Sequence, residues 1–182
     1  MVFFDTLPAG ARPAASHASH LTPVSHLTPM HLTLLCVGRL SSEYAALQGR
    51  YLRMLRPYAE VEVVEVGETP LTQGAARVLT TEGERLRQRL RPHAYTVALD
   101  RRGSQVDSQG LSALLAEQKL YGRSDFQFIL GGALGLHERV VAAADFVWSL
   151  SELTFPHQLA RCIVLEQLYR AARIERGEPY HH

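Results

Sequence analysis

The sequence predicts a single α/β domain with a mainly parallel sheet and helices on both of its faces. Short apolar segments alternate five times with segments of helical periodicity between Met30 and Gly177. Prolines and glycines stand between these segments, as expected for the turns that connect strands and helices. With 182 residues, the chain is long enough for one domain of this kind and a short appendage.

The first half of the domain is predicted as strand, helix, strand and helix. The apolar run over residues 31–37 is typical of a buried strand, and Gly38 ends it. Ser41 or Ser42 can cap the helix that follows, which continues to about Arg56 before a proline stops it. The remaining elements of this half are a strand over residues 61–66 and a helix with apolar positions at Ala75, Leu79, Leu86 and Leu90.

The second half continues the same alternation. A third strand has Asp100 at its carboxyl end, and Asp107 or Ser108 opens the next helix. The last helix is predicted from Pro156, a favoured first helical position, to Gly177, a typical residue just past a helix end. The strands of this half cover residues 95–99, 126–130 and 146–149, with a short helix before the last of them.

Residues 1–29 differ in composition from the rest of the chain. They are rich in alanine, proline and histidine, and a proline every few residues blocks both helix and strand pairing. A secretory signal is not expected, because no basic residues followed by a continuous apolar stretch are present. We expect residues 1–29 to be a disordered extension, or to lie upstream of a true start at Met30, and residues 30–182 to form the folded domain.

The composition argues against several functional classes. The 19 Lys and Arg residues nearly balance the 18 Asp and Glu residues, and a net charge of +1 does not suit a strongly basic nucleic-acid coat or a polybasic membrane anchor. No apolar run approaches the roughly 18 residues that a membrane span needs. Cys36 and Cys162 both lie in apolar runs, which indicates buried thiols in a reducing compartment.

Ligands of parallel α/β sheets bind at the carboxyl ends of the strands, and three segments are predicted to lie there. They are residues 99–100, 131–135 and 150–156. The glycines of the second segment permit positive φ and let the backbone approach a ligand closely. Their GGxxG spacing matches neither the dinucleotide fingerprint nor a P-loop, so a cofactor loop and a plain tight turn both stay open.

The segment 150–156 leads from the fifth strand into the last helix. Its free backbone N–H and C=O groups can hydrogen-bond a nucleobase-like ring between Leu150, Leu153 and Phe155. The alternative is an ordinary helix-entry loop in which Thr154 caps the helix. His157 falls in the first helical turn, where the helix dipole disfavours its charged form, and it is either a base or a surface residue.

Arginines of the last helix and the terminal residues form a second group of candidates. Arg161 and Arg170 lie on this helix, and near its C-terminus the dipole favours cations without any functional role. Tyr180 and His181 can stack on and hydrogen-bond to a base, with an ordinary frayed terminus as the alternative. No His or Cys cluster has zinc spacing and no nucleophile–base pair is supported, so no metal is expected.

Several strings, in a fixed order, resemble one known family. HLTLLCVG opens the domain at residue 31, FILGG lies at residues 128–132, and LSELTFPH occupies residues 150–157. EQLYRA at residues 166–171 and PYH at residues 179–181 follow. Together they are similar to the RlmH (YbeA-type) family of bacterial methyltransferases in the SPOUT superfamily, over residues 30–182.

The resemblance implies an S-adenosylmethionine-dependent enzyme that methylates N3 of a pseudouridine in 23S (large-subunit) ribosomal RNA within the ribosome. It also implies a SPOUT-type α/β knot, whose C-terminal trefoil knot is a rare exception to unknotted topology. A cytoplasmic homodimer with cofactor pockets beside the subunit interface is expected, without DNA or a membrane as partner.

The candidate functional residues fall into two sets, of which only the cofactor loops are carried over from the family by motif. The enzyme has to align N3 with an activated methyl group and to help remove the N3 proton. Candidates for substrate positioning or proton handling are His157, Arg161, Arg170, Tyr180 and His181. The cofactor loops fall on Leu99, Gly131, Gly132, Leu150, Ser151, Glu152, Leu153, Thr154 and Phe155.

The sequence departs from the family at its C-terminus. Members often have a basic residue after the terminal Tyr-His, whereas here His182 follows, so any charge there depends on pH. A function of another class also stays open, namely a cofactor-binding α/β module that acts in ribosome assembly without chemistry.

Overall fold

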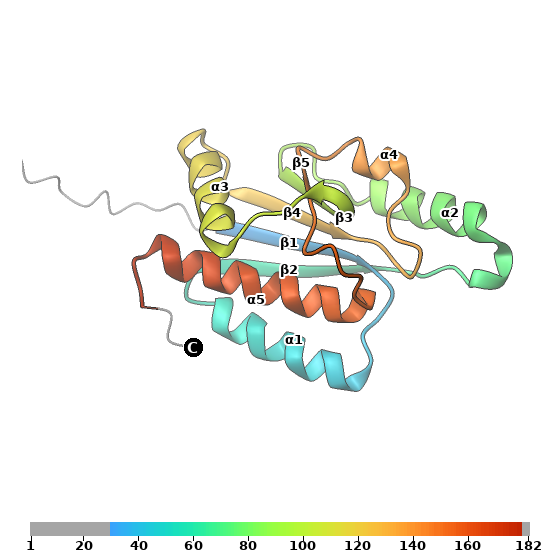
Figure 1. The fold of residues 1–182 in the computed structure, drawn as a ribbon, viewed down its shortest axis with the longest axis horizontal. Helices are drawn as coiled ribbons and strands as arrows, with labels where there is room; N and C mark the ends of the chain where they lie inside the picture. Colours follow the sequence, from blue (N-terminus) through green and yellow to red (C-terminus); the bar gives the residue numbers. More distant parts are fainter. Residues whose placement is uncertain (1–29, 180–182) are drawn as a thin grey trace, which may run out of the picture.

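The structure is a computed structural model that describes residues 30–179 (Figure 1). The expectations for residues 1–29, and those for Tyr180 and His181, lie outside the described residues. No helix within the described range combines the length and apolar content that crossing a bilayer requires.

The described strands form one sheet in the order β2-β1-β4-β3-β5, and every pair in it is parallel. This confirms the predicted α/β class with a parallel sheet. Because β4 lies between β1 and β3, the loop that follows β4 emerges near the middle of the carboxyl edge of the sheet. The strands are β1 (Met30–Val37), β2 (Ala59–Val66), β3 (Tyr95–Ser104), β4 (Asp125–Leu130) and β5 (Phe146–Trp148).

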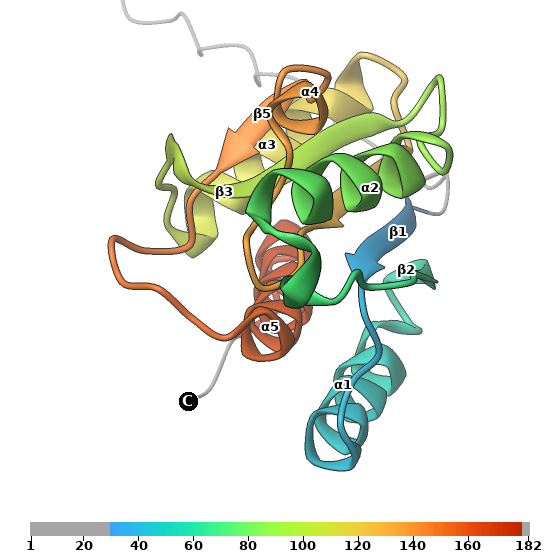
Figure 2. The same ribbon diagram turned by 90° about the vertical axis from the view of Figure 1, so that its right-hand side faces the viewer.

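Helices cover both faces of the sheet, as predicted (Figure 2). One face packs against α1, α3 and α5, and the other against α2 and α4. The helices are α1 (Ser42–Leu55), α2 (Ala75–Arg87), α3 (Ser108–Leu120), α4 (Glu138–Val141) and α5 (His157–Glu175), with a 3₁₀ turn η1 (Leu71–Gln73) before α2.

Alternating side chains of the central strands build two separate cores. Leu32 and Leu34 of β1 point into the core made with α1, α3 and α5, and Leu35 and Val37 point into the core made with α2 and α4. All four are almost fully buried. A strand covered on both faces has apolar residues at nearly every position, which is why β1 has a continuous apolar sequence.

The buried face of α2 differs from the predicted one. The helix itself is confirmed, but Ala75 at its start is exposed, and the buried residues are Val78, Glu82, Gly83 and Leu86. Gly83 decides this face, because a Cβ atom there would come within 2.7 Å of the His137 side chain. The apolar pattern predicts Ala75 in the first turn as a core residue, which is wrong. The same pattern gives no reason to expect the carboxylate of Glu82 in the core.

The third strand is longer than predicted. It continues past Leu99 to Ser104, across an irregularity in the register, and Ser104 pairs with Trp148 of β5. Gly103 makes this possible, because a Cβ atom at that position would lie 2.4 Å from the Val147 carbonyl oxygen. The polar sequence of residues 100–104 concealed this extension, since its pairing depends on the backbone.

The helix caps agree only in part with the sequence. Asp107 caps α3 as predicted, and its side chain accepts a 2.6 Å hydrogen bond from the Gly110 N–H. Ser41 precedes α1, but its hydroxyl makes no capping bond, and its N–H donates instead to Gln158 at 2.8 Å. That bond ties the start of α1 to the first turn of α5.

We expect Asp107→Ala to lower the free energy of unfolding by about 1 kcal/mol, because the Gly110 N–H loses its acceptor. Urea denaturation followed by circular dichroism measures this change. Asp107→Asn keeps an acceptor at the same place and should cost much less. Equal losses in both variants would show that the cap contributes nothing to stability.

Candidate functional site

The predicted cofactor segments lie at one edge of the sheet. Residues 131–135 follow β4, and residues 149–156 lead from β5 into α5. Since all the strands are parallel, these loops meet at the carboxyl edge together with Gly38 after β1. Leu99 differs from the other predicted cofactor residues, because it does not lie in a loop. It is half-buried within the extended β3 and pairs with Trp148.

The loop after β4 is a tight turn built on glycines. A Cβ atom at Gly131 would lie 2.2 Å from the Gly135 carbonyl oxygen. Gly135 has a φ of +81° and donates its N–H to the Gly132 carbonyl at 3.0 Å. Only residues without side chains permit this conformation, so the backbone of the turn stays open to close approach from outside. The tight turn is therefore present, and cofactor binding at Gly131 and Gly132 stays a prediction.

A buried carboxylate lies behind this turn. A Cβ atom at Gly132 would be 2.9 Å from Glu82 Oε2 and 3.0 Å from Val37 Cγ1. Glu82 is 3 % exposed, and its Oε1 accepts the Thr69 N–H at 2.8 Å. Its Oε2 has no hydrogen-bond partner among the described residues. Sequence reasoning missed Glu82, because an acidic residue on an amphipathic helix is normally assigned to the solvent face.

The loop before α5 exposes most of its backbone groups. The Leu153 N–H donates to Ser151 Oγ at 3.0 Å, and Ser149 Oγ donates to the Ser151 carbonyl at the same distance. The N–H groups of Ser151, Glu152, Thr154 and Phe155 have no partner within residues 30–179. The alternative in which Thr154 caps the helix is wrong, because Pro156 occupies the N-cap position and no side chain caps α5.

Apolar side chains stand exposed in both loops. Leu153 is 72 % exposed and Leu134 is 41 % exposed. Trp148, directly before the second loop, buries its indole N–H without an acceptor among the described residues. Apolar groups exposed beside free backbone donors are what a ligand with a flat ring covers. The loops thus offer close backbone approach, apolar walls and, at Glu82, an unpaired carboxylate oxygen.

Arg161 forms a buried ion pair at the same edge. It is 2 % exposed, its Nη1 lies 2.6 Å from Glu65 Oε1, and its Nη2 donates to the Gly38 carbonyl at 2.8 Å. The guanidinium joins the first turns of α5 to the ends of β1 and β2. Its direct role on substrate stays a prediction, and the structure places it as a support beneath the site.

His157 is half-buried beside Gly38. Its Nε2 lies 3.9 Å from the position of a Gly38 Cβ atom, and Glu68 Oε2 lies 3.1 Å from the same point. His157 is therefore at the carboxyl edge of the sheet, together with the cofactor loops. Glu68 lies on another side of Gly38 and makes no ion pair with His157 within 4.0 Å, so a role of His157 in proton transfer stays a prediction.

Both cysteines are buried, as predicted. Burial raises the pKa of the Cys36 thiol to about 12, and the neighbouring Arg161 opposes this only in part. Burial also raises the pKa of Cys162. The thiols are therefore protonated and unreactive at neutral pH.

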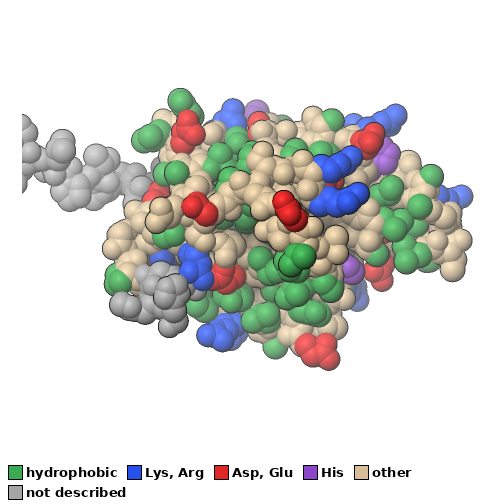
Figure 3. Space-filling view, viewed as in Figure 1, with side chains coloured by type: hydrophobic (Ala, Val, Ile, Leu, Met, Phe, Trp, Pro, Cys, Tyr) green, Lys and Arg blue, Asp and Glu red, His purple; other side chains and the backbone are tan. Residues whose placement is uncertain are grey.

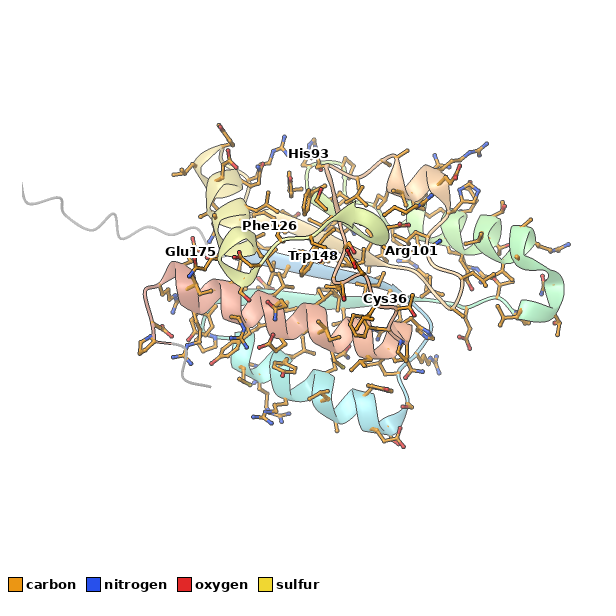
Figure 4. The ribbon with its side chains drawn as sticks, in the orientation of Figure 1. Cys36, His93, Arg101, Phe126, Trp148 and Glu175 are labelled. Atoms are coloured by element: carbon orange, nitrogen blue, oxygen red, sulfur yellow. The ribbon has the colours of Figure 1, made fainter. Side chains whose placement is uncertain are left out.

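Arg170 lies in the half of α5 farther from the cofactor loops. Its Nη2 forms a 2.7 Å ion pair with Glu166 Oε1, one turn earlier on the helix. Arg173 donates from Nη2 to the Pro179 carbonyl at 2.7 Å, which fixes the start of the C-terminal segment there. Figure 4 shows the separation: Glu175 at the end of α5 lies at one end of the molecule, and Cys36 and Arg101 lie toward the other.

The C-terminal segment is held by an aromatic and ionic cluster. Tyr58 donates its hydroxyl to Glu178 at 2.6 Å and makes an edge-on ring contact with Tyr169 at 5.7 Å. Arg176 stacks on Tyr58 with its guanidinium carbon 4.5 Å from the ring centre. These contacts place Pro179 near the amino edge of the sheet, and the structure does not bring Arg170 together with His157.

Two cavities of the described residues lie away from the cofactor loops. A cavity of about 1020 Å³ opens at the amino edge, between Met30, Tyr58, Lys119 and Arg176. A smaller one of about 490 Å³ lies near His93 and Asp145. Neither of these two cavities is lined by a predicted cofactor residue. Residues 30–179 hold no group of three or more metal-ligating side chains.

Comparison with known proteins identifies the class. The family model described as "Predicted SPOUT methyltransferase" matches residues 30–181, which include the parallel α/β sheet, the glycine turn after β4 and the loop before the last helix. The chain belongs to the SPOUT methyltransferase family.

Relatives give a more particular name. A protein of Pelotomaculum thermopropionicum called "Ribosomal RNA large subunit methyltransferase H" is 48 % identical over 158 residues, covering 84 % of this chain and 99 % of the relative. A protein of Moorella thermoacetica with the same name is 43 % identical over 159 residues, with the same coverage.

Solved structures agree with the fold. A probable methyltransferase from Bordetella pertussis Tohama I superimposes with a TM-score of 0.53 at 12 % identity, covering 79 % of this chain and 95 % of that one. At this identity the likeness concerns the fold alone.

We expect Gly131→Ala to abolish ligand binding at the turn while leaving the domain folded, because the added Cβ atom overlaps the Gly135 backbone. Calorimetric titration with S-adenosylmethionine tests this. Gly49→Ala is the matched control, since its Cβ atom on α1 meets nothing closer than 3.5 Å. Unchanged affinity in Gly131→Ala would contradict a cofactor role for the turn.

We expect Arg161→Ala to lower the free energy of unfolding by about 3 kcal/mol, because it leaves Glu65 and the Gly38 carbonyl without their partner. Glu65→Gln should cost only about 1 kcal/mol, since the Glu65 side chain is 34 % exposed. Urea denaturation measures both, with exposed Arg53→Ala as the control. Wild-type stability in Arg161→Ala would show that the ion pair does not support the fold.

Proposed function

We propose that the protein is an S-adenosylmethionine-dependent methyltransferase that methylates N3 of a pseudouridine in 23S ribosomal RNA of the large ribosomal subunit. The observation that carries this proposal is the 48 % identity to a protein called "Ribosomal RNA large subunit methyltransferase H", over 99 % of the length of that protein. The loops at the carboxyl edge support it, because their glycines and free N–H groups suit a bound cofactor.

The residues present fit S-adenosylmethionine. Gly131 and Gly132 allow a ligand to approach the backbone, and the loop before α5 offers unpaired N–H groups for an adenine ring between Leu150, Leu153 and Phe155. When bound, this cofactor supplies a methyl group that is already activated by the positive sulfur.

The chain's task is then to position the substrate and to handle one proton. Methyl transfer forms a C–N bond at N3, breaks the C–S bond and releases the N3 proton, so an acceptor for that proton has to stand near the loops. His157 is the candidate acceptor at this edge, where both it and Glu68 lie near Gly38. Arg161 holds the start of α5, and thereby His157, in place.

We infer that two copies of the chain are needed for one complete site. The 19 residues of α5 span about 28 Å, and Pro179 is fixed at the far end from the cofactor loops. Tyr180 and His181 extend the chain by only about 7 Å beyond Pro179. If these residues act on the substrate, they reach the loops of a second protomer and not those of their own.

The surface of α1 and α5 suits such a partner. Figure 3 shows hydrophobic side chains gathered over these helices, beside the loop that leads into α5. Leu159 and Ile163, one turn apart on α5, are only half-buried, and Leu153 in the loop before this helix is exposed. An apolar helix surface of this kind is typical of isologous dimer contacts. We propose a homodimer on this basis. A cytoplasmic location and the trefoil knot are proposed from the family to which the chain belongs.

We expect the purified protein to transfer a labelled methyl group from S-adenosylmethionine to ribosomes, and the product nucleoside to be N3-methylpseudouridine by mass spectrometry. Assembled ribosomes and free large subunits, tested in parallel, decide which of them is the substrate. Binding of S-adenosylmethionine without transfer to either would favour the non-catalytic assembly module. Absence of binding would overturn both readings.

Mixed dimers test the shared site. Gly131→Ala damages the loops, and a double change of Tyr180→Phe and His181→Ala damages the tail, so each homodimer should be inactive. After the two variants exchange subunits, half of the dimers carry both types of chain, and each of these has one intact site. We expect about a quarter of the wild-type activity to return. No recovery after confirmed exchange would show that the tail acts within its own protomer, and full activity of the tail variant would show that it has no role.

A further inference from the structure

Glu82 is the one described carboxylate that is almost fully buried and retains an oxygen without a partner. It lies on α2, behind the Gly131–Gly135 turn, with Gly132 and Val37 as its neighbours. Taking a carboxylate out of water is costly unless its oxygens receive hydrogen bonds or face a positive charge. Only Oε1 is satisfied, by the Thr69 N–H at 2.8 Å.

No basic side chain within residues 30–179 pairs with Glu82. The nearest on its own helix, Arg85, donates instead to the Gly67 carbonyl at 2.7 Å and to Thr69 Oγ1 at 3.0 Å. Arg85 therefore holds the loop that donates to Glu82, and its positive charge lies near the carboxylate without pairing with it directly. His137, which contacts the neighbouring Gly83, accepts the Arg139 N–H through its Nδ1 at 3.1 Å.

The free oxygen is directed at the cofactor turn. Glu82 Oε2 is the heavy atom closest to the position where a Gly132 Cβ atom would stand, at 2.9 Å. Only the thin backbone of the turn separates this oxygen from a ligand seated on the glycines. A negative charge behind an apolar, water-excluded wall acts across such a distance more strongly than it would in water.

We propose that Glu82 is a positioning and specificity residue that makes the turn select a cationic ligand, and so favours the methyl donor over the spent cofactor. The proposal rests on the function proposed above. S-adenosylmethionine carries a positive sulfur, whereas S-adenosylhomocysteine, the product of transfer, has a neutral thioether at the same place. The carboxylate attracts the first and is indifferent to the second, so the loss of charge on transfer weakens binding and promotes release.

Binding of three ligands to Glu82→Gln tests the proposal. The amide keeps the shape of the side chain and an oxygen for the Thr69 N–H, and removes only the charge. We expect the affinity for S-adenosylmethionine to fall by about tenfold or more. The affinity for sinefungin, which carries a protonated amine in place of the sulfonium, should fall likewise. The affinity for S-adenosylhomocysteine should stay within about twofold. Calorimetry measures all three, and the fluorescence of Trp148, the single tryptophan of the chain, gives a second readout.

Matched variants separate charge from structure. Glu84→Gln removes a charge from the same helix, where Glu84 pairs with Arg87 at 3.1 Å on the surface, and should leave the ratio of affinities unchanged. Glu82→Asp keeps the charge and should keep the ratio. Should Glu82→Gln fail to fold, Glu82→Leu replaces the buried charge with an apolar group and should lose the ratio in the same way.

The outcomes are distinct. Equal changes for all three ligands in Glu82→Gln, or no change, would overturn the role of Glu82 and leave the proposed function intact. If the wild-type protein binds none of the three ligands, the proposed function itself fails.

Discussion

The parallel pairing of β4 between β1 and β3 is the constraint on which the rest of the molecule depends. It buries β4 on both faces, with Phe128 in one core and Ile129 in the other, so the strand is mostly apolar. Its buried polar residue, Gln127, accepts the Arg91 N–H and donates to the Arg89 carbonyl. The backbone groups along the paired strands bond to one another, so the free backbone groups of the sheet lie where the strands end. Because every strand points the same way, the glycine turn, the loop before α5 and the end of β1 come together at one edge without any direct contact being required by the sequence.

The length of α5 is the second constraint, and it separates the functional candidates into two groups. His157 and Arg161 stand at the carboxyl edge, whereas Arg170 and the terminal segment stand at the amino edge beside Tyr58. A rigid helix of 19 residues cannot fold back to join them. The homodimer proposed above would bring the two groups together, because two-fold symmetry places the end of one α5 near the start of the other when the helices cross antiparallel.

Much of this arrangement could be predicted from the sequence, and the exceptions have physical causes. The alternation of apolar segments predicts every strand, and Asp107 predicts the start of its helix, because burial and capping each require particular residue types within a short stretch of sequence. The extension of β3 to Ser104 has no such local pattern, since it depends on the absence of a side chain at Gly103, which packs against Val147. Thr154 has the right chemistry for a cap, yet the chain places Pro156 there. The position of Glu82 could not be predicted, because it is defined by the contact with Gly132, fifty residues away in the sequence, and not by the pattern of its own helix.

The near-neutral charge of the chain gains a meaning from this geometry. A net charge of +1 gives little long-range attraction to RNA, so recognition of a large structured RNA has to rely on shape and on a few placed groups. In a dimer the arginines of one α5 terminus would stand beside the cofactor loops of the other protomer, concentrating charge where the substrate base lies. The buried carboxylate of Glu82 then acts on the opposite side of the same loops, toward the methyl donor. In this proposal, positive charge on one side of the glycine turn attracts the RNA, and the negative charge of Glu82 on the other side attracts the methyl donor. The glycine backbone between them is thin enough for both charges to act on one reacting centre.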